Sequence, residues 1–132
     1  MRFLLDTNIV SDLVRNPMGR SEQRLAAVGE SNVCTSVIVA AELRFGIERK
    51  KSIRLERQVE LILQRLEVVS LDVPADKVYA KVRARLELGG RLISANDMLI
   101  AAHALALGMT LVTDNDREFA RVEGLAVENW VR

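Results

Sequence analysis

The sequence predicts an α/β fold with a central parallel sheet of about five short strands and helices on both faces. Three observations support this prediction. The chain has 132 residues, which suits one domain (residues 1–132) better than two. Its composition, 49% hydrophobic and 28% charged, is that of a globular protein with a core. Short runs of β-forming residues alternate with longer segments of helical period, as in parallel-sheet proteins.

The predicted elements follow one another along the chain. Strands are expected at residues 3–5, 32–35, 68–69, 110–113 and 125–127. Helices are expected at residues 38–48 and 52–66, from Pro74 to the Gly89-Gly90 pair, and from Ser94 or Asn96 to Leu107. In residues 52–66 apolar side chains recur every three or four positions, which is the period of a helix. In such folds the ligand site lies at the carboxyl ends of the strands.

Composition excludes several classes of protein. Nineteen Lys and Arg against eighteen Asp and Glu give a net charge of +1, unlike a strongly basic protein that coats nucleic acid. A single cysteine, Cys34, allows no intramolecular disulfide and no thiolate zinc site. A single histidine, His103, excludes sites that need two imidazoles, and we interpret it as structural. The apolar runs are too short for a membrane span, so we expect a cytoplasmic protein that contacts no membrane.

Acidic residues occur where predicted strands end and predicted helices begin. Asp6 directly follows the first strand, and Asp114 and Asp116 follow the fourth. Asp97 lies in the first turn of a predicted helix. Glu42 lies in a largely apolar helical stretch, where a carboxylate is costly to bury without a partner. Because the carboxyl ends of parallel strands meet at one edge of the sheet, we expect these acids to converge.

A cluster of carboxylates has a chemical use. Like charges repel one another, and a divalent cation relieves that repulsion. Mg²⁺ prefers oxygen ligands and usually binds one or two carboxylates with several waters, and the scarcity of His and Cys argues against zinc. A metal-bound water beside a phosphodiester hydrolyses it. Simpler explanations stay open: Asp6 and Asp97 as helix caps, and the acidic loop after the fourth strand as a solvated turn.

Four segments together resemble the PIN-domain family and, more narrowly, its VapC-type toxins. They are Leu4–Ile9, Ala41–Leu43 with Gly46, Asn96–Ala102 and Thr110–Asn115. The resemblance extends to Trp130 and so covers almost the whole chain. It implies a Mg²⁺-dependent endoribonuclease, in which Mn²⁺ is an alternative metal.

The resemblance also implies roles for particular residues. The acids that match the family's metal ligands are Asp6 and Asp97, and Glu42 completes the cluster. For the fourth acid we prefer Asp116, with Asp114 and Glu118 as the open alternatives. Thr113 resembles a hydroxyl residue that orients a water or an acid.

A substrate and partners are implied in the same way. The Arg117-Glu118-Phe119 segment and the C-terminal end resemble VapC toxins that cleave initiator tRNA, so we expect structured RNA, tRNA above all, as the substrate. A VapB-type antitoxin, a homodimer, and contact with operator DNA only through the antitoxin are also implied. Candidate RNA contacts are Arg44, Lys50, Arg91 and Arg117, since phosphate contacts supply much of the affinity for RNA. A solvated helical face is the simpler explanation for most of these cations.

Other classes of protein fit the sequence less well than a nuclease does. One is a non-cleaving PIN-like module that binds its antitoxin in a DNA-bound repressor complex, but the intact set of acids argues for catalysis. A phosphate-accepting signalling domain needs an early acidic doublet and a Lys after the last strand, and neither is in place. A dinucleotide enzyme needs a glycine-rich fingerprint after the first strand, which this sequence lacks.

Overall fold

Five parallel strands form one sheet in the order β3-β2-β1-β4-β5. The structure is a computed structural model and describes residues 2–132. The strands are β1 (Phe3–Leu5), β2 (Val33–Ser36), β3 (Glu67–Val69), β4 (Thr110–Val112) and β5 (Val127–Glu128). The predicted fold class is therefore confirmed, although the last strand lies slightly later in the chain than expected.

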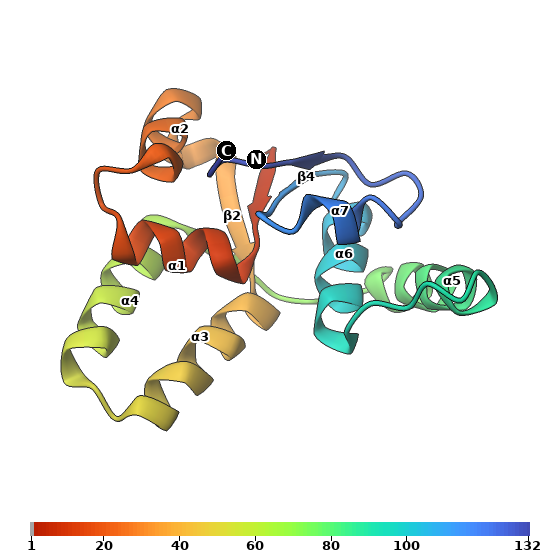
Figure 1. Ribbon diagram of the computed structural model, residues 1–132, viewed down its shortest axis with the longest axis horizontal. Coiled ribbons are helices and arrows are strands. Elements are labelled where there is room, and N and C mark those ends of the chain that lie inside the picture. Colours follow the sequence, from red (N-terminus) through yellow and green to blue (C-terminus); the bar gives the residue numbers. More distant parts are fainter. Residues whose placement is uncertain (1) are drawn as a thin grey trace.

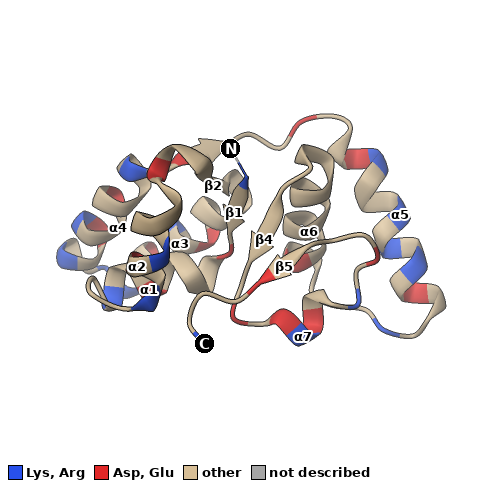
Figure 2. Cartoon of the chain, turned by 90° about the horizontal axis from the view of Figure 1, so that it is seen from above, with Lys and Arg blue, Asp and Glu red and all other residues tan. Residues whose placement is uncertain are grey.

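Helices cover both faces of this sheet. In the order of the chain they are α1 (Thr7–Arg15), α2 (Arg20–Val28), α3 (Val37–Lys50), α4 (Ile53–Arg65), α5 (Ala75–Leu88), α6 (Ala95–Leu107) and α7 (Asp116–Phe119), with a 3₁₀ turn at Glu30–Asn32. Figures 1 and 2 show α1 to α4 gathered on one side of the strands and α5 and α6 on the other. None of the helices in residues 2–132 is both long and apolar enough to cross a membrane.

Serine residues cap three of the helices that follow strands or turns. The Oγ of Ser36 accepts a hydrogen bond from the Ile38 N–H at 3.1 Å at the start of α3. Ser52 does the same for α4, and Ser94 for α6. The observed start of α6 thus selects Ser94 over Asn96 as its cap. At its other end α6 stops at Gly108, whose φ of 68° is a conformation that glycine adopts without strain.

The core lies between the sheet and the helices on its two faces. Leu4, Leu5 and Leu111 are fully buried, and the Phe3 ring packs against Trp130 with 5.5 Å between ring centroids. His103 is also buried, and its Nδ1 lies 2.8 Å from the Oγ of Ser36. This contact confirms the structural interpretation of His103 and ties α6 to the end of β2.

Candidate active site

Asp6 lies at the carboxyl end of the central strand β1, where it is also the N-cap of α1. Because β1 pairs in parallel with β4, with Leu5 opposite Val112, the next residues along each strand, Asp6 and Thr113, become neighbours. The Thr113 hydroxyl donates to one carboxylate oxygen of Asp6 at 2.8 Å. The Thr7 N–H donates to the other at 2.7 Å. Both oxygens of this buried carboxylate are therefore fixed in position.

Glu42 is brought to the same place by α3. It is half-buried in the second turn of this helix, and the Thr7 hydroxyl donates to its Oε1 at 2.6 Å. Thr7 thus contacts Asp6 through its backbone and Glu42 through its side chain. The sequence does not predict this role for Thr7, because a contact between residues 35 positions apart leaves no local pattern in the sequence.

Asp97 approaches from the first turn of α6. Its backbone N–H donates to the Ser94 Oγ at 3.2 Å, which closes the N-terminal turn of the helix. Partial burial raises the pKa of Asp97, and the negative charges of Glu118 and Glu42 raise it further. Two acids from other elements are therefore close enough to act on its carboxylate.

The electrostatics of Asp6 report the same convergence. Burial raises the pKa of its carboxyl group to about 6, and the negative charges of Asp97 and Glu42 add to that effect, against the hydrogen bonds from Thr113 and Thr7. The fold thus holds three carboxyl groups together at one edge of the sheet, and the pKa values of Asp6 and Asp97 are raised there. Such a site gains most from a positive charge placed among the acids.

The structure assigns different surroundings to the three acids of the loop after β4. The carboxylate of Asp114 accepts from the Asn8 amide at 3.0 Å. Asp116 accepts from Asn129 at 3.3 Å and lies 3.5 Å from the Arg132 guanidinium. The Asn129 hydrogen bond lowers the pKa of Asp116, as does the charge of Arg132.

Glu118 faces the other way. Its charge acts on Asp97, and its carboxylate accepts from the side-chain amide of Asn115. Residues two positions apart differ by about 200° around a helix, so Asp116 and Glu118 point to nearly opposite sides of α7. The preferred fourth acid, Asp116, thus turns toward the C-terminal segment, while the alternative, Glu118, turns toward the other acids.

The donor set fits a hard cation bound by few protein ligands. Among residues 2–132, no three His, Cys, Asp or Glu side chains are arranged to hold one ion together. Mg²⁺ does not require three, because it usually keeps several waters and takes one or two carboxylates. Asp6 and Asp97 supply two carboxyl groups, and a cation bound between them would offset the burial and the neighbouring negative charges that raise their pKa.

Of the four predicted RNA contacts, Lys50 lines a groove that also contains Glu42. A groove of about 260 Å³ between α1, α3 and α4 is lined by Thr7 and Glu42 at one end and by Arg15, Arg49 and Lys50. Arg91 is exposed on the loop that precedes α6, and Arg117 is exposed within α7. Arg44 forms an ion pair with Glu60, so its guanidinium already has a partner.

Comparisons with known proteins identify this architecture. The family model of the PIN domain matches residues 3–125. The chain belongs to the PIN-domain family.

Its relatives place it, within that family, among the VapC ribonucleases. The chain is 36% identical to "Ribonuclease VapC2" of Rickettsia felis and 35% identical to "tRNA(fMet)-specific endonuclease VapC" of Shigella flexneri, each alignment covering 98% of both chains. The crystal structure of VapBC2 from Rickettsia felis bound to a promoter DNA fragment superposes with a TM-score of 0.92, at 34% identity over 98% of this chain and 99% of that one. The family predicted from the four sequence segments is confirmed.

Proposed function

We propose that this chain is a Mg²⁺-dependent endoribonuclease, the toxin of a type II toxin–antitoxin pair, which inhibits translation by hydrolysing phosphodiester bonds in structured RNA. The observation that carries this proposal is the buried carboxyl group of Asp6, whose pKa is raised to about 6 in the company of Asp97 and Glu42. A purely structural cap has no need of two further acids beside it. The names of the VapC relatives support the same activity.

The proposed roles follow from the contacts of each acid. We assign the metal to Asp6 and Asp97, with Glu42 and Glu118 completing the cluster and Asp116 outside it. Mg²⁺ bound there supplies an acidified water and offsets negative charge on the phosphate. Thr113 holds one oxygen of Asp6, which fixes the rotamer of this carboxylate, and Thr7 holds Glu42. Asp6, Glu42 and Glu118 each accept a hydrogen bond from a side-chain donor that orients the carboxylate.

The proposed substrate is tRNA, and initiator tRNA in particular. A curated relative from Shigella flexneri is named for that substrate, and the alignment to it runs through 98% of both chains. Lys50 lines a groove with Glu42, and Arg117 lies between Asp116 and Glu118 in α7. We propose that these two cations and Arg91 supply positive charge for the RNA backbone. Because the proposed substrate is tRNA, we also propose that the protein acts in the cytoplasm.

A VapB-type antitoxin is the proposed partner. Solved relatives from Rickettsia felis and Salmonella typhimurium are VapBC complexes bound to DNA, with TM-scores of 0.92 and 0.89. We propose that this chain also pairs as a homodimer and meets operator DNA only through its antitoxin.

The test of the proposal is a cleavage assay with antitoxin-free protein. Initiator tRNA and elongator methionine tRNA are incubated with the protein in MgCl₂ or in EDTA, beside an Asp97→Asn control. We expect discrete fragments of initiator tRNA that require both Mg²⁺ and Asp97. Cleavage that persists in EDTA or in the variant would contradict the site assignment.

One alternative has an observation in its favour. Since solved relatives are bound to DNA with their antitoxins, the chain could serve only as a non-cleaving member of a repressor complex. The same assay separates the two functions. For this purpose the assay also includes a pool of total RNA. A folded protein that binds Mg²⁺ and its antitoxin but cuts no RNA of this pool would favour the repressor role.

A further inference from the structure

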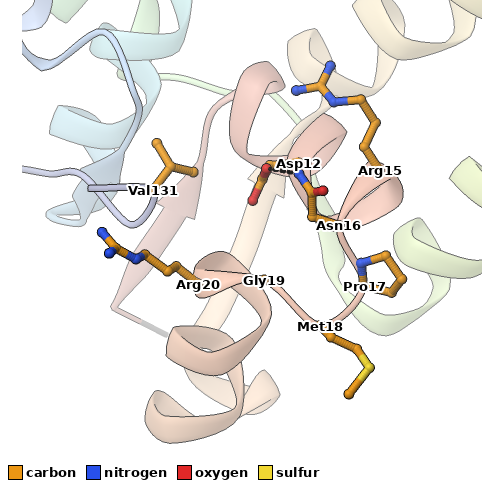
Figure 3. Close-up of a pocket in the computed structure, with 8 residues that line it drawn as sticks. All are labelled: Asp12, Arg15, Asn16, Pro17, Met18, Gly19, Arg20 and Val131. Carbon is orange, nitrogen blue, oxygen red and sulfur yellow. Dashed lines mark hydrogen bonds between the residues drawn. The ribbon is translucent and has the colours of Figure 1, made fainter.

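We propose that Arg15 and Arg20, which line one hollow, are two phosphate contacts that hold the RNA backbone a few nucleotides away from the scissile bond. This inference rests on the proposed function, because it names how the same substrate is held. The site is the hollow between the C-terminal end of α1, the start of α2 and the C-terminal segment of the chain (Figure 3). Its volume is about 470 Å³.

The hollow presents positive charge that the fold does not use. Arg15 and Arg20 are exposed, and within residues 2–132 neither takes part in a salt bridge. The one acid that lines the hollow, Asp12, accepts a hydrogen bond from the Asn16 side chain at 2.7 Å (Figure 3). Because these two guanidinium groups pair with no carboxylate of the described residues, they are free to bind an anion.

Arg20 also connects this hollow to a second one of about 420 Å³. That second hollow is lined by Arg20, Gln23, Arg24, Asn129, Trp130 and Arg132, so it contains three arginines and no acid. Two of its residues contact the acidic loop, since Asn129 donates to Asp116 and Arg132 pairs with it. Arg24 pairs with Glu128, so among the three arginines of this hollow Arg20 is the one that forms no salt bridge within residues 2–132.

Arg15 makes the matching connection on the other side. It lines both the hollow with Arg20 and the groove that contains Thr7 and Glu42. Arg15 lies eight residues beyond Thr7 in α1, which is about 12 Å along the helix axis. That distance is the span of roughly three or four stacked nucleotides at about 3.4 Å each. An RNA strand cut at the acids thus reaches Arg15 within a few phosphates, and Arg20 lines the same hollow as Arg15.

The experiment measures binding of initiator tRNA as a function of salt. All proteins carry Asp97→Asn to prevent cleavage, and R15A/R20A is compared with K77A/K81A, which removes two positive charges from the exposed face of α5. Each lost phosphate contact flattens the slope of log K against log[salt] by about 0.7 for a single strand. We expect R15A/R20A to flatten the slope by about 1.4 and K77A/K81A to leave it unchanged. R15K/R20K keeps the charge and should restore most of the slope.

Kinetics with Asp97 intact provide the second readout. R15A/R20A should raise KM and leave kcat unchanged, because the two arginines bind RNA away from the reacting phosphate. An unchanged slope and KM, in a variant whose melting temperature matches the parent, would overturn the inference while leaving the nuclease intact. A variant that binds RNA normally but loses its antitoxin would reassign the hollow to the protein partner. Failure of the unaltered chain to bind initiator tRNA would instead contradict the proposed substrate.

Discussion

Asp6 combines a fixed position with an unfavourable charge. Both of its carboxylate oxygens accept hydrogen bonds, from Thr7 and Thr113, yet burial raises its pKa to about 6. Hydrogen bonds to the ionised form oppose this shift, and they are outweighed by burial and by the charges of Asp97 and Glu42. The position of the Asp6 carboxylate is fixed, but its surroundings disfavour the ionised form. Asp6 is therefore preorganised for a cation, and its negative charge destabilises the fold when no metal is bound.

That cost gives a pH-dependent prediction for Asp6→Asn. The folded pKa of about 6 exceeds the unfolded value of about 3.9, so ionisation of Asp6 removes stability as the pH rises through this interval. Without metal at about pH 8, the variant should be more stable than the parent by up to about 3 kcal/mol, and the gain should vanish near pH 4. Urea unfolding in EDTA at the two pH values measures it.

Addition of MgCl₂ is the control for this prediction. A ligand that binds only the folded state stabilises it. Mg²⁺ should therefore raise the free energy of unfolding of the parent, and it should raise that of Asp6→Asn much less. Equal stabilities of the two proteins at about pH 8 in EDTA would show that Asp6 carries no such charge penalty.

The two acids of α7 make a matched pair for catalysis. The negative charge of Glu118 raises the pKa of Asp97, whereas Asp116 accepts a hydrogen bond from Asn129 and pairs with Arg132. Glu118→Gln should therefore lower the rate of tRNA cleavage by about 100-fold or more, while Asp116→Asn should change it less than severalfold. Single-turnover rates at saturating Mg²⁺ measure both. The opposite order of effects would restore Asp116 as the fourth acid.

At the scale of elements, the junctions between strands and helices place the acids. Asp6 ends β1 and begins α1, and Asp97 lies one turn into α6 behind its Ser94 cap. The sequence predicted the four longest helices, from the apolar period of α4 and from the residues that begin and end α5 and α6. It did not predict α1 and α2, of nine residues each, or α7, of four, since so few turns leave little period to detect.

The caps give a prediction at this scale. Ser36 caps α3 and also contacts the buried ring of His103, whereas Ser52 caps α4 with a single backbone contact. Ser52→Ala should cost about 1 kcal/mol of stability, as an ordinary cap does. Ser36→Ala should cost about 1–3 kcal/mol more, because it also leaves the buried imidazole without its partner. Urea unfolding compares them, and equal losses would mean that the contact with His103 contributes nothing.

At the scale of the molecule, the parallel sheet turns distant segments into one site. The hydrogen bond between Thr113 and Asp6 joins residues 107 positions apart, because β4 lies directly beside β1. That the acids converge could be predicted from strand ends alone. The side-chain partners could not: the choice among Asp114, Asp116 and Glu118 depends on the rotation of α7, and the contact of Thr7 with Glu42 on how α1 packs against α3.

The most direct test of the account is to locate the metal. Crystals of the protein soaked in MnCl₂ give an anomalous signal at each bound Mn²⁺, a cation with the same preference for oxygen ligands as Mg²⁺. We predict one strong peak within coordination distance of the Asp6 and Asp97 carboxylates, and its loss in crystals of Asp97→Asn. Mn²⁺ bound elsewhere, or a peak that survives the loss of Asp97, would contradict the claim that these acids hold the catalytic cation.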